Sequence, residues 1–460
     1  MDGLALRSRS GAGLLAGTAL GSGLAVLDTT VVNVALPHIG TGLHAPLAGL
    51  QWTVTAYTLM LAAFVLLGGS LGDRWGRKRV FGLGTAWFVA ASVLCGLSGG
   101  IWWLVAARAL QGLGAALLVP SSLALLNATL RPADRARAIG AWAGSTGMAA
   151  ALGPPLGGWL IDALSWRWVF FLNLPLGLAA LLVTGRYVPD SRGPHAAPGF
   201  DVAGALLGAA GLAGVTYALV GGSLLAGAGG LVGLVAFVVV ERRSARPMVP
   251  PALFASREFT VINAVTLLVY AALGGVLFFF VLHLQVTAGY PALAAGAANT
   301  PITLLLLAGS PLTGALSRRS GPRLPMTAGC LLAALGAVAL RHVGPHAVYW
   351  RDVLPPVTLY GLGMMCIVAP LTAGVLAAAD VRHAGVASGV NNAVARAGSL
   401  LAVASLPALV GLVAYADPVA VDRAYRTALW YCAGLMLAGA LLSATLPRRG
   451  APVPLRRDQP

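Results

Sequence analysis

The sequence predicts an all-α integral membrane protein with two six-helix bundles and two extra spans between them. Hydrophobic residues make up 58% of the 460 positions and charged residues only 10%, whereas soluble domains carry roughly a quarter charged residues. The chain also divides into fourteen apolar stretches, each near the roughly 20 residues that a bilayer-crossing helix needs. Finally, two glycine-bearing segments recur at nearly the same offset.

This composition excludes several classes of protein. A soluble enzyme of this length lacks the charge needed to coat its apolar surface. The formal net charge of +16 would indicate nucleic-acid binding in a soluble protein, but basic loops also orient membrane helices. We therefore expect a lipid bilayer and no nucleic acid as partner. The single lysine, Lys78, stands outside any phosphate-binding loop, so energy would come from an ion or solute gradient or from another subunit.

The apolar stretches set the order of the elements. The expected spans are 13–36, 53–72, 80–98, 101–126, 138–161, 168–185, 202–220, 224–240, 261–285, 293–316, 325–341, 353–378, 386–414 and 428–446. With both termini in the cytoplasm, 23 of the 30 basic residues fall in inside segments, five in outside loops and two within spans. Such asymmetry is typical of the positive-inside rule. It predicts a multi-pass protein of the plasma (inner) membrane with both termini cytoplasmic.

An internal repeat divides these spans. The segment 69–78 after the second span recurs as 314–323 after the tenth, and Gly112-Leu113-Gly114 recurs as Gly361-Leu362-Gly363. The offsets, 245 and 249, indicate a duplicated six-helix unit, and parallel halves of this kind characterise one transporter architecture. The expected domains are an N-terminal six-helix bundle (1–190), two linker spans with flanking cytoplasmic segments (191–250), a C-terminal six-helix bundle (251–447) and a cytoplasmic tail (448–460).

Charge inside a span is costly, so it is usually functional or paired. Asp28 is the only carboxylate deep in a predicted span, about 12 Å from the outer end of span one, and Arg108 lies about 10 Å from the outer end of span four. These depths agree, which predicts an Asp28–Arg108 pair facing a central cavity. Either the pair couples a proton, with Arg108 tuning Asp28, or it is a static structural ion pair.

Other polar residues within the spans are candidates for cavity lining. His283 can be a packing residue or a relay, and Arg396 can line the cavity or extend toward the cytoplasm. The four cysteines lie in apolar runs without a C-x-x-C pair, so we expect packed thiols and no metal or cofactor. The possible cavity-lining residues are Asn33, Gln111, His283, Gln285, Asn392 and Arg396.

Two glycine-bearing motifs suggest moving parts. In the basic loop after span two, Asp73 can pair with Arg74 or Arg77 or cap a helix, and such a latch can hold one conformation; the simpler alternative is a topology signal. Span five combines helix-kinking prolines with glycines that allow close helix packing. This combination would suit either a pivot or leak barrier between the halves or ordinary helix packing. The expected switch residues are Gly69, Asp73, Arg74, Gly76, Arg77 and Lys78, and those of span five are Gly147, Gly153, Pro154, Pro155, Gly157 and Gly158.

Together these motifs resemble the major facilitator superfamily. The 69–78 loop resembles its signature between spans two and three, Arg108–Ala116 its span-four motif, and Gly147–Gly158 its antiporter motif. Two further segments, Leu27–Pro37 and Trp166–Pro175, resemble the fourteen-span drug:proton antiporters. The resemblance implies that the loop switches between outward and inward states and that Arg108 takes part in proton coupling. The C-terminal copy departs from the pattern, with Arg318 at the position of Asp73.

The resemblance implies a monomeric, non-enzymatic secondary transporter. It would export drugs, antibiotics or related lipophilic molecules by alternating access, driven by the proton gradient, with protonation of Asp28 weakening substrate binding. Two alternatives stay open: a proton-coupled uptake symporter, which the Gly-Pro-Pro segment disfavours, and a non-transporting membrane sensor or permease subunit, which would need neither Asp28 nor Arg108. A membrane-embedded enzyme is least expected, because no nucleophile–base pair or metal cluster is visible.

Overall fold

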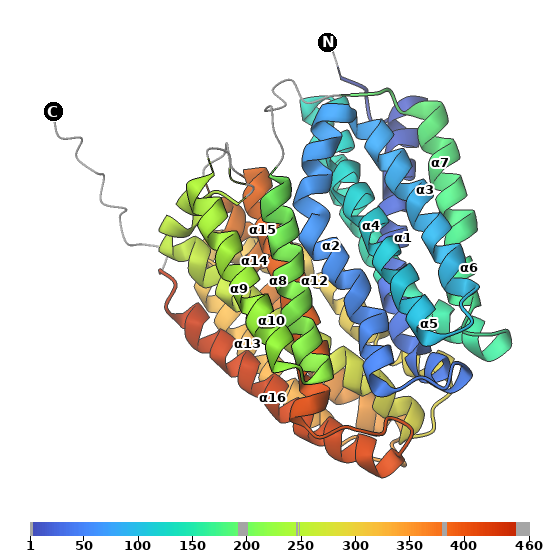
Figure 1. The fold of residues 1–460 in the computed structure, drawn as a ribbon. Helices are drawn as coiled ribbons and strands as arrows, with labels where there is room; N and C mark the ends of the chain where they lie inside the picture. Colours follow the sequence, from blue (N-terminus) through green and yellow to red (C-terminus); the bar gives the residue numbers. More distant parts are fainter. Residues whose placement is uncertain (1–2, 192–200, 245–246, 248, 380–383, 448–460) are drawn as a thin grey trace.

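The computed structural model describes residues 3–191, 201–244, 247, 249–379 and 384–447. The described chain is helical almost throughout (Figure 1), apart from an isolated bridge between Leu4 and Leu130. Thirteen of its described helical segments are long and apolar enough to cross a membrane. The fourteenth expected span lies in α5, which is 32 residues long, but its charged first turns and its glycines and prolines give it a weaker apolar signal.

The first half of the chain forms a bundle in which α1 packs on α5 and α7, and α4 packs on α2 and α3. Leu172 separates the expected sixth span into the short α6 and the longer α7. The helices of this N half are α1 (Arg9–Gly42), α2 (Leu47–Trp75), α3 (Arg77–Gly96), α4 (Ile101–Thr129), α5 (Pro132–Ala163), α6 (Trp168–Phe171) and α7 (Asn173–Tyr187).

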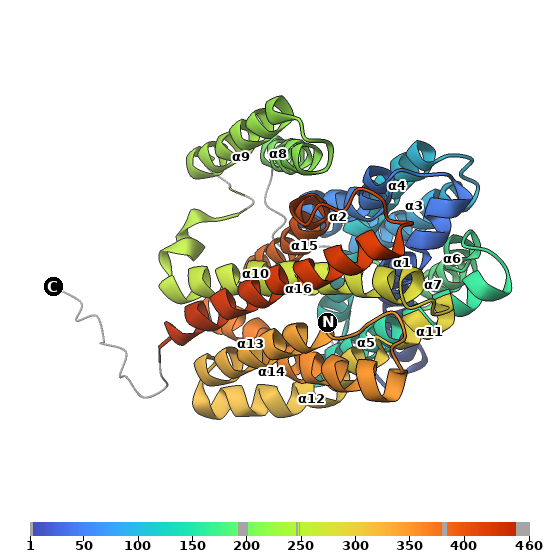
Figure 2. The same ribbon diagram turned by 90° about the horizontal axis from the view of Figure 1, so that it is seen from below.

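Two helices, α8 (Val202–Gly221) and α9 (Leu224–Arg243), form a hairpin at the periphery. Figure 2 shows the hairpin outside both bundles, and α8 contacts α2 and α15. Tyr217 of α8 packs near Trp52 of α2, with ring centroids 6.3 Å apart. The hairpin's outer face is strongly apolar and exposed, as lipid-facing helices require.

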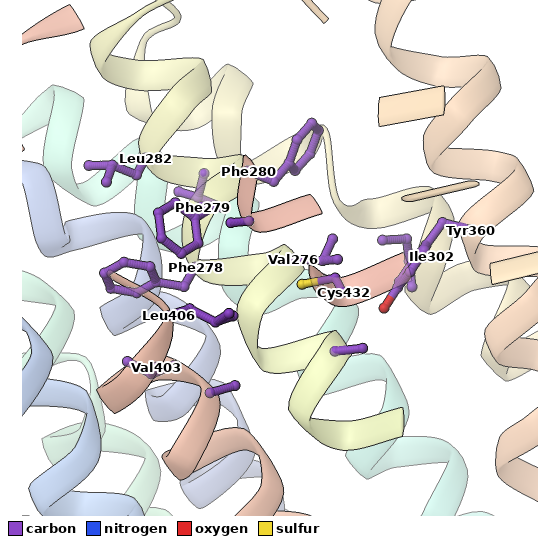
Figure 3. Close-up of a cluster of buried hydrophobic side chains, with 14 of the residues drawn as sticks. Val276, Phe278, Phe279, Phe280, Leu282, Ile302, Tyr360, Val403, Leu406 and Cys432 are labelled. Atoms are coloured by element: carbon purple, nitrogen blue, oxygen red, sulfur yellow. The ribbon is translucent and has the colours of Figure 1, made fainter. Parts of the chain in front are cut away.

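The second half repeats the arrangement, with α13 packed on α14 and α16, and α10 on α15 and α16. Figure 3 shows its core, where Phe279 and Val276 of α10 lie among side chains from neighbouring helices. The elements of this C half are η1 (Pro251–Ala255), α10 (Arg257–Val286), α11 (Ala292–Ala297), α12 (Thr300–Ser320), α13 (Arg323–Leu340), η2 (Tyr349–Val353), α14 (Leu354–Ala378), α15 (Ala384–Leu409) and α16 (Pro418–Ala444).

The internal repeat is visible in the backbone. Gly76 (φ 105°) ends α2 and Gly321 (φ 79°) ends α12, and these positions are 245 residues apart. The positive φ at both breaks favours glycine, because a Cβ there is strained. Gly114 of α4 abuts Phe88 of α3, while Gly363 of α14 abuts Ala333 of α13 at the corresponding place. The two halves therefore share one packing scheme.

Several helices extend beyond their expected ends. α1 ends at Gly42 instead of near position 36, because Pro37 is accommodated within the helix. α16 starts at Pro418, ten residues earlier than expected. α15, by contrast, ends at Leu409, five residues before the expected end at 414. The expected loop between spans two and three shrinks to Gly76 alone, because α2 continues to Trp75 and α3 begins at Arg77.

Candidate functional site

A buried carboxylate, Asp28, lies at the centre of the N half. Its side chain is inaccessible to solvent and accepts hydrogen bonds from three residues on two other helices. Arg108 of α4 donates to Oδ2, while Gln111 Nε2 (2.9 Å) and Asn173 Nδ2 (2.8 Å) donate to Oδ1. Both carboxylate oxygens are therefore hydrogen-bonded, and one of the three donors is cationic.

Arg108 is equally enclosed, with 1% of its surface exposed. Besides Asp28 it donates Nε to the Thr53 carbonyl oxygen (3.1 Å) and a terminal nitrogen to Gln111 Oε1 (2.6 Å). Its guanidinium lies 4.3 Å from the centroid of the Tyr57 ring. Additional hydrogen bonds offset part of the desolvation cost of a buried ion pair, and Arg108 makes two besides the one to Asp28.

The Asp28–Arg108 pair predicted from depth is therefore present, but one assumption behind it was wrong. Since α1 extends to Gly42, Asp28 lies fourteen residues from the end of its helix, against seven residues for Arg108 from the start of α4. The two side chains still meet because α1 projects beyond α4.

Sequence reasoning assigned no role to Asn173, Tyr57 or Thr53. Asn173 donates to Asp28 and also to Ser92 Oγ (2.9 Å), which joins α3 to the network. The sequence alone could have indicated Asn173, because it places an amide inside the expected sixth span. An uncharged polar side chain within a span usually makes an interhelical hydrogen bond.

The glycine and proline residues of α5 face both α1 of the N half and α11 of the C half. Gly153 and Gly157 face Thr30 and Val31 of α1, and Gly158 faces the backbone of α11 at Ala292. α11 approaches in return: Gly296 abuts the backbone of Pro154. α5 runs through both prolines as one helix. The segment therefore permits backbone-to-backbone contact between halves, as small residues do in membrane helices.

Three side chains join the halves by hydrogen bonds to backbone groups. Asp162, at the end of α5, accepts from the N–H groups of Ala292 (3.1 Å) and Leu293 (2.9 Å). Gln285 of α10 donates to the Val34 carbonyl oxygen (2.9 Å). Gln51 of α2 donates to the carbonyl oxygens of Val403 and Ala404 in α15, both at 3.0 Å. All three lie toward the bundle end away from Gly76, which we call the far end.

The opposite, basic end carries the expected switch residues Arg77 and Lys78. Asp73 pairs with Arg77 at 2.8 Å, one of the partners that the sequence allowed. Lys78 donates to the Gly185 carbonyl oxygen (3.1 Å). Gly76 itself abuts the carboxylate of Asp190. The Asp73–Arg77 pair, the Lys78 hydrogen bond and the approach of Gly76 to Asp190 lie within the N half.

Gly69 and Gly147, which complete the two motifs, face Pro120 of α4 and Leu307 of α12, respectively. Gly147 therefore adds a cross-half contact midway along α5. Arg74, another expected switch residue, is at the end of α2 and has interactions of its own.

The candidate cavity-lining residues have different surroundings. His283 is fully buried within the C half, stacked on Tyr425 and 3.7 Å from Asp422, so it lines no open space here. Gln111 is also fully buried, in the Asp28 network. Asn33 borders a small pocket between the halves. Asn392 and Arg396 of α15 keep solvent access and are joined by a 2.8 Å hydrogen bond.

No group of three or more His, Cys, Asp or Glu side chains suited to a metal ion occurs in the described residues. The four cysteines are free, and Cys95, Cys330 and Cys432 are buried among apolar helices. The polar chemistry within the described membrane spans therefore rests on the carboxylate, guanidinium, amide and hydroxyl groups above.

Comparison with known proteins places this arrangement in a family. The family model of the Major Facilitator Superfamily matches residues 18–403. The chain is 36% identical over 404 residues to a probable actinorhodin transporter of Streptomyces coelicolor, covering 84% of this chain and 70% of the relative. It is 34% identical to the tetracenomycin C resistance and export protein of Streptomyces glaucescens, covering 88% and 76%. It is 37% identical to the puromycin resistance protein pur8 of Streptomyces alboniger, covering 83% and 78%.

Solved structures share the fold at low sequence identity. A peptide transporter POT in complex with sulfate superposes with a TM-score of 0.69 at 16% identity, covering 96% of this chain and 97% of the other. An inward-facing bacterial homologue of the human lysosomal transporter Spinster gives 0.65 at 17% identity, covering 95% and 97%. With two bundles, a repeated packing scheme and a family match over most of its length, the chain is a multi-pass membrane transporter, not an enzyme, and belongs to the Major Facilitator Superfamily.

Proposed function

We propose that this transporter is a proton-driven exporter of antibiotics, drugs or related lipophilic small molecules, of the fourteen-span antiporter type. The names of the relatives support export, since they include an actinorhodin transporter and a tetracenomycin C export protein. The α8–α9 hairpin supports the fourteen-span type, because it supplies two helices beyond two six-helix bundles. The basic end would face the cytoplasm, with the protein in the plasma membrane.

The observation that carries the proposal is the Asp28 network. Among the described spans, Asp28 is the one carboxylate more than two turns from a helix end. Protonation would remove its charge and leave Arg108 as an uncompensated buried cation, which costs several kcal/mol. The proton state of Asp28 would therefore change the relative stability of two conformations, as proton coupling requires.

The contacts between the halves suggest where the present conformation stands in such a cycle. Asp162, Gln285 and Gln51 hold the halves together toward the far end. We assign this form to an inward-facing state with Asp28 ionised, ready to receive substrate from the cytoplasm. Binding would then loosen the far-end contacts, and a proton entering from outside would return the carrier.

The test is accumulation of fluorescent or radiolabelled drugs in cells lacking their own exporters. We would compare wild type, Asp28→Asn and empty vector, each with and without a protonophore. Asp352→Asn is the matched control, because Asp352 pairs with Arg351 near the protein surface. We expect lower accumulation in wild type and in the control, and loss of that effect with Asp28→Asn or with the protonophore.

Two other results would count against parts of the proposal. Export that ignores Asp28→Asn would keep the transporter but remove Asp28 as the coupling acid. Purified protein that moves substrate equally well without a pH gradient or membrane potential would remove proton coupling altogether.

A further inference from the structure

A second arginine lies deep in the membrane-spanning region, on the C half. Arg396 is the thirteenth residue of the 26-residue α15, about 18 Å from the start of that helix. In the described part of the chain no carboxylate pairs with it, and its Nε donates a hydrogen bond to Asn392 Oδ1 at 2.8 Å. A charged side chain at this depth is expensive and typically faces a water-filled space or a ligand.

The packing of α15 defines where Arg396 points. One face meets α10, where Asn391 donates to Thr266 Oγ1 (2.7 Å). Another face meets α2, through Gly389 against Leu66 and the hydrogen bonds from Gln51. Figure 2 shows α2 and α15 side by side.

Arg396 belongs to the sector between these two faces. It lies close enough to Tyr57 of α2 and Tyr270 of α10 to interact electrostatically with both. Leu401, turned about 140° from it on the helix, lines an apolar groove with Trp430 of α16 on the bundle's outer side. Arg396 is therefore on the side of α15 that is turned toward the N half, and its side chain is partly exposed.

The charges around Tyr57 do not balance. Arg108 lies over the Tyr57 ring and is neutralised by Asp28. That carboxylate is engaged by Arg108, Gln111 and Asn173, and its ion pair is with Arg108. Among the described residues, Arg396 is therefore an arginine of the spans without a carboxylate partner.

We propose that Arg396, with Asn392 beside it, is the subsite that binds a carboxylate group of an aromatic substrate. The guanidinium supplies a planar fork of donors that matches a carboxylate, and the partly exposed Tyr270 ring offers contact area for an aromatic body. This inference rests on the proposed function, because it names the substrate class of the same transport path. It predicts a preference for aromatic acids over neutral or cationic analogues of the same shape.

The experiment uses the purified full-length protein in detergent and three probes on one scaffold. These are 1-pyrenecarboxylate, its methyl ester and 1-pyrenemethylamine, which are an anion, a neutral molecule and a cation. Energy transfer from the protein's tryptophans to pyrene reports binding, with empty micelles subtracted. The variants are Arg396→Gln, Arg396→Lys and, as control, Arg423→Gln, which removes an exposed arginine from α16.

We expect wild type and Arg423→Gln to bind the carboxylate more tightly than the ester and the amine. Arg396→Gln should weaken carboxylate binding by about tenfold or more, the scale of a lost charged hydrogen bond, and leave ester binding unchanged. Arg396→Lys should keep part of the preference, because it retains charge without the planar fork. Monodisperse elution of each variant verifies folding.

Equal binding of carboxylate and ester by wild type, absence of carboxylate binding, or an equal loss for both probes in Arg396→Gln would overturn the subsite. The cellular accumulation assay separates this failure from failure of the proposed function. Export of the drug panel without carboxylate preference leaves the exporter and removes the subsite. Arg396-dependent carboxylate binding without export of any compound keeps the subsite and removes the exporter.

Discussion

The two halves of this transporter share a scaffold but not its chemistry. Gly112 and Gly114 of α4 have counterparts in Gly361 and Gly363 of α14, which pack against equivalent neighbours. At the same offset of 249, however, the position of Arg108 is occupied in the C half by Val357, which is fully buried. The repeat thus preserves the close helix contacts that build the bundle, while the buried arginine–carboxylate pair of the described residues lies in the N half.

The basic-end segments show the same contrast. Gly76 and Gly321 both adopt positive φ and end α2 and α12, so the backbone break is retained. The positions of Asp73 and Arg77 correspond to Arg318 and Pro322, so the ion pair of the N half has no equivalent there. Backbone geometry constrains both copies, whereas charge is needed only where a function depends on it.

The largest expected effect comes from breaking the ion pair that distinguishes the halves. Arg108→Leu leaves Asp28 buried without its cation, which we expect to lower the free energy of unfolding by about 3–5 kcal/mol and to abolish transport. Thermal unfolding in detergent measures the first effect and drug accumulation the second.

The double variant Asp28→Asn with Arg108→Gln sharpens this test. Two neutral groups replace two charges, so stability should recover substantially while transport stays absent. If Arg108→Leu alone were as stable as wild type, the ion pair would not be the element that stabilises the N half.

The next effect concerns the surface where the halves meet. Gly158→Val places a branched side chain against the backbone of Ala292, and overpacking of this kind costs about 1–3 kcal/mol. We expect transport to fall sharply with helicity by circular dichroism unchanged. Gly82→Val is the control, because a Cβ at Gly82 meets nothing within 4 Å. Unimpaired transport in Gly158→Val would show that this crossing is not required.

A smaller effect is expected at the far end. Asp162→Asn weakens the hydrogen bonds to Ala292 and Leu293, a loss of about 1 kcal/mol. The opening between the halves should then be populated about fivefold more. Maleimide labelling of Asn33→Cys, with the four native cysteines replaced, measures this because Asn33 borders the pocket between the halves. If Asn33→Cys were labelled at the same rate with and without Asp162→Asn, Asp162 would not hold the far end closed.

The smallest effect on stability is expected at the basic end. The Asp73 side chain is 45% exposed, so its pairing with Arg77 should contribute less than about 1 kcal/mol. A double-mutant cycle with Asp73→Asn and Arg77→Gln, followed by thermal unfolding, measures the coupling. A larger coupling energy would mean that this pair stabilises the N half as strongly as a buried one.

Most of the scaffold was predictable from local sequence because membrane insertion depends on segment length, hydropathy and flanking charge. Helix ends were less predictable: Pro37 reads as a stop signal but lies inside α1. For the site, the scarcity of buried charge made Asp28 and Arg108 conspicuous. Asn173 carries no charge and lies on another helix, so only packing identifies it as a partner of Asp28.

The sequence by itself determined that this protein crosses the membrane many times, that its two halves are related, and that Asp28 and Arg108 are the charges to explain. The cost of placing charge and exposed backbone in lipid leaves little freedom on those points. Only the tertiary structure decided which groups satisfy Asp28, that α5 and α11 touch backbone to backbone, and that Gln51 joins α2 to α15. Those facts depend on contacts between helices far apart in the chain, whose rotations and crossings no local pattern specifies.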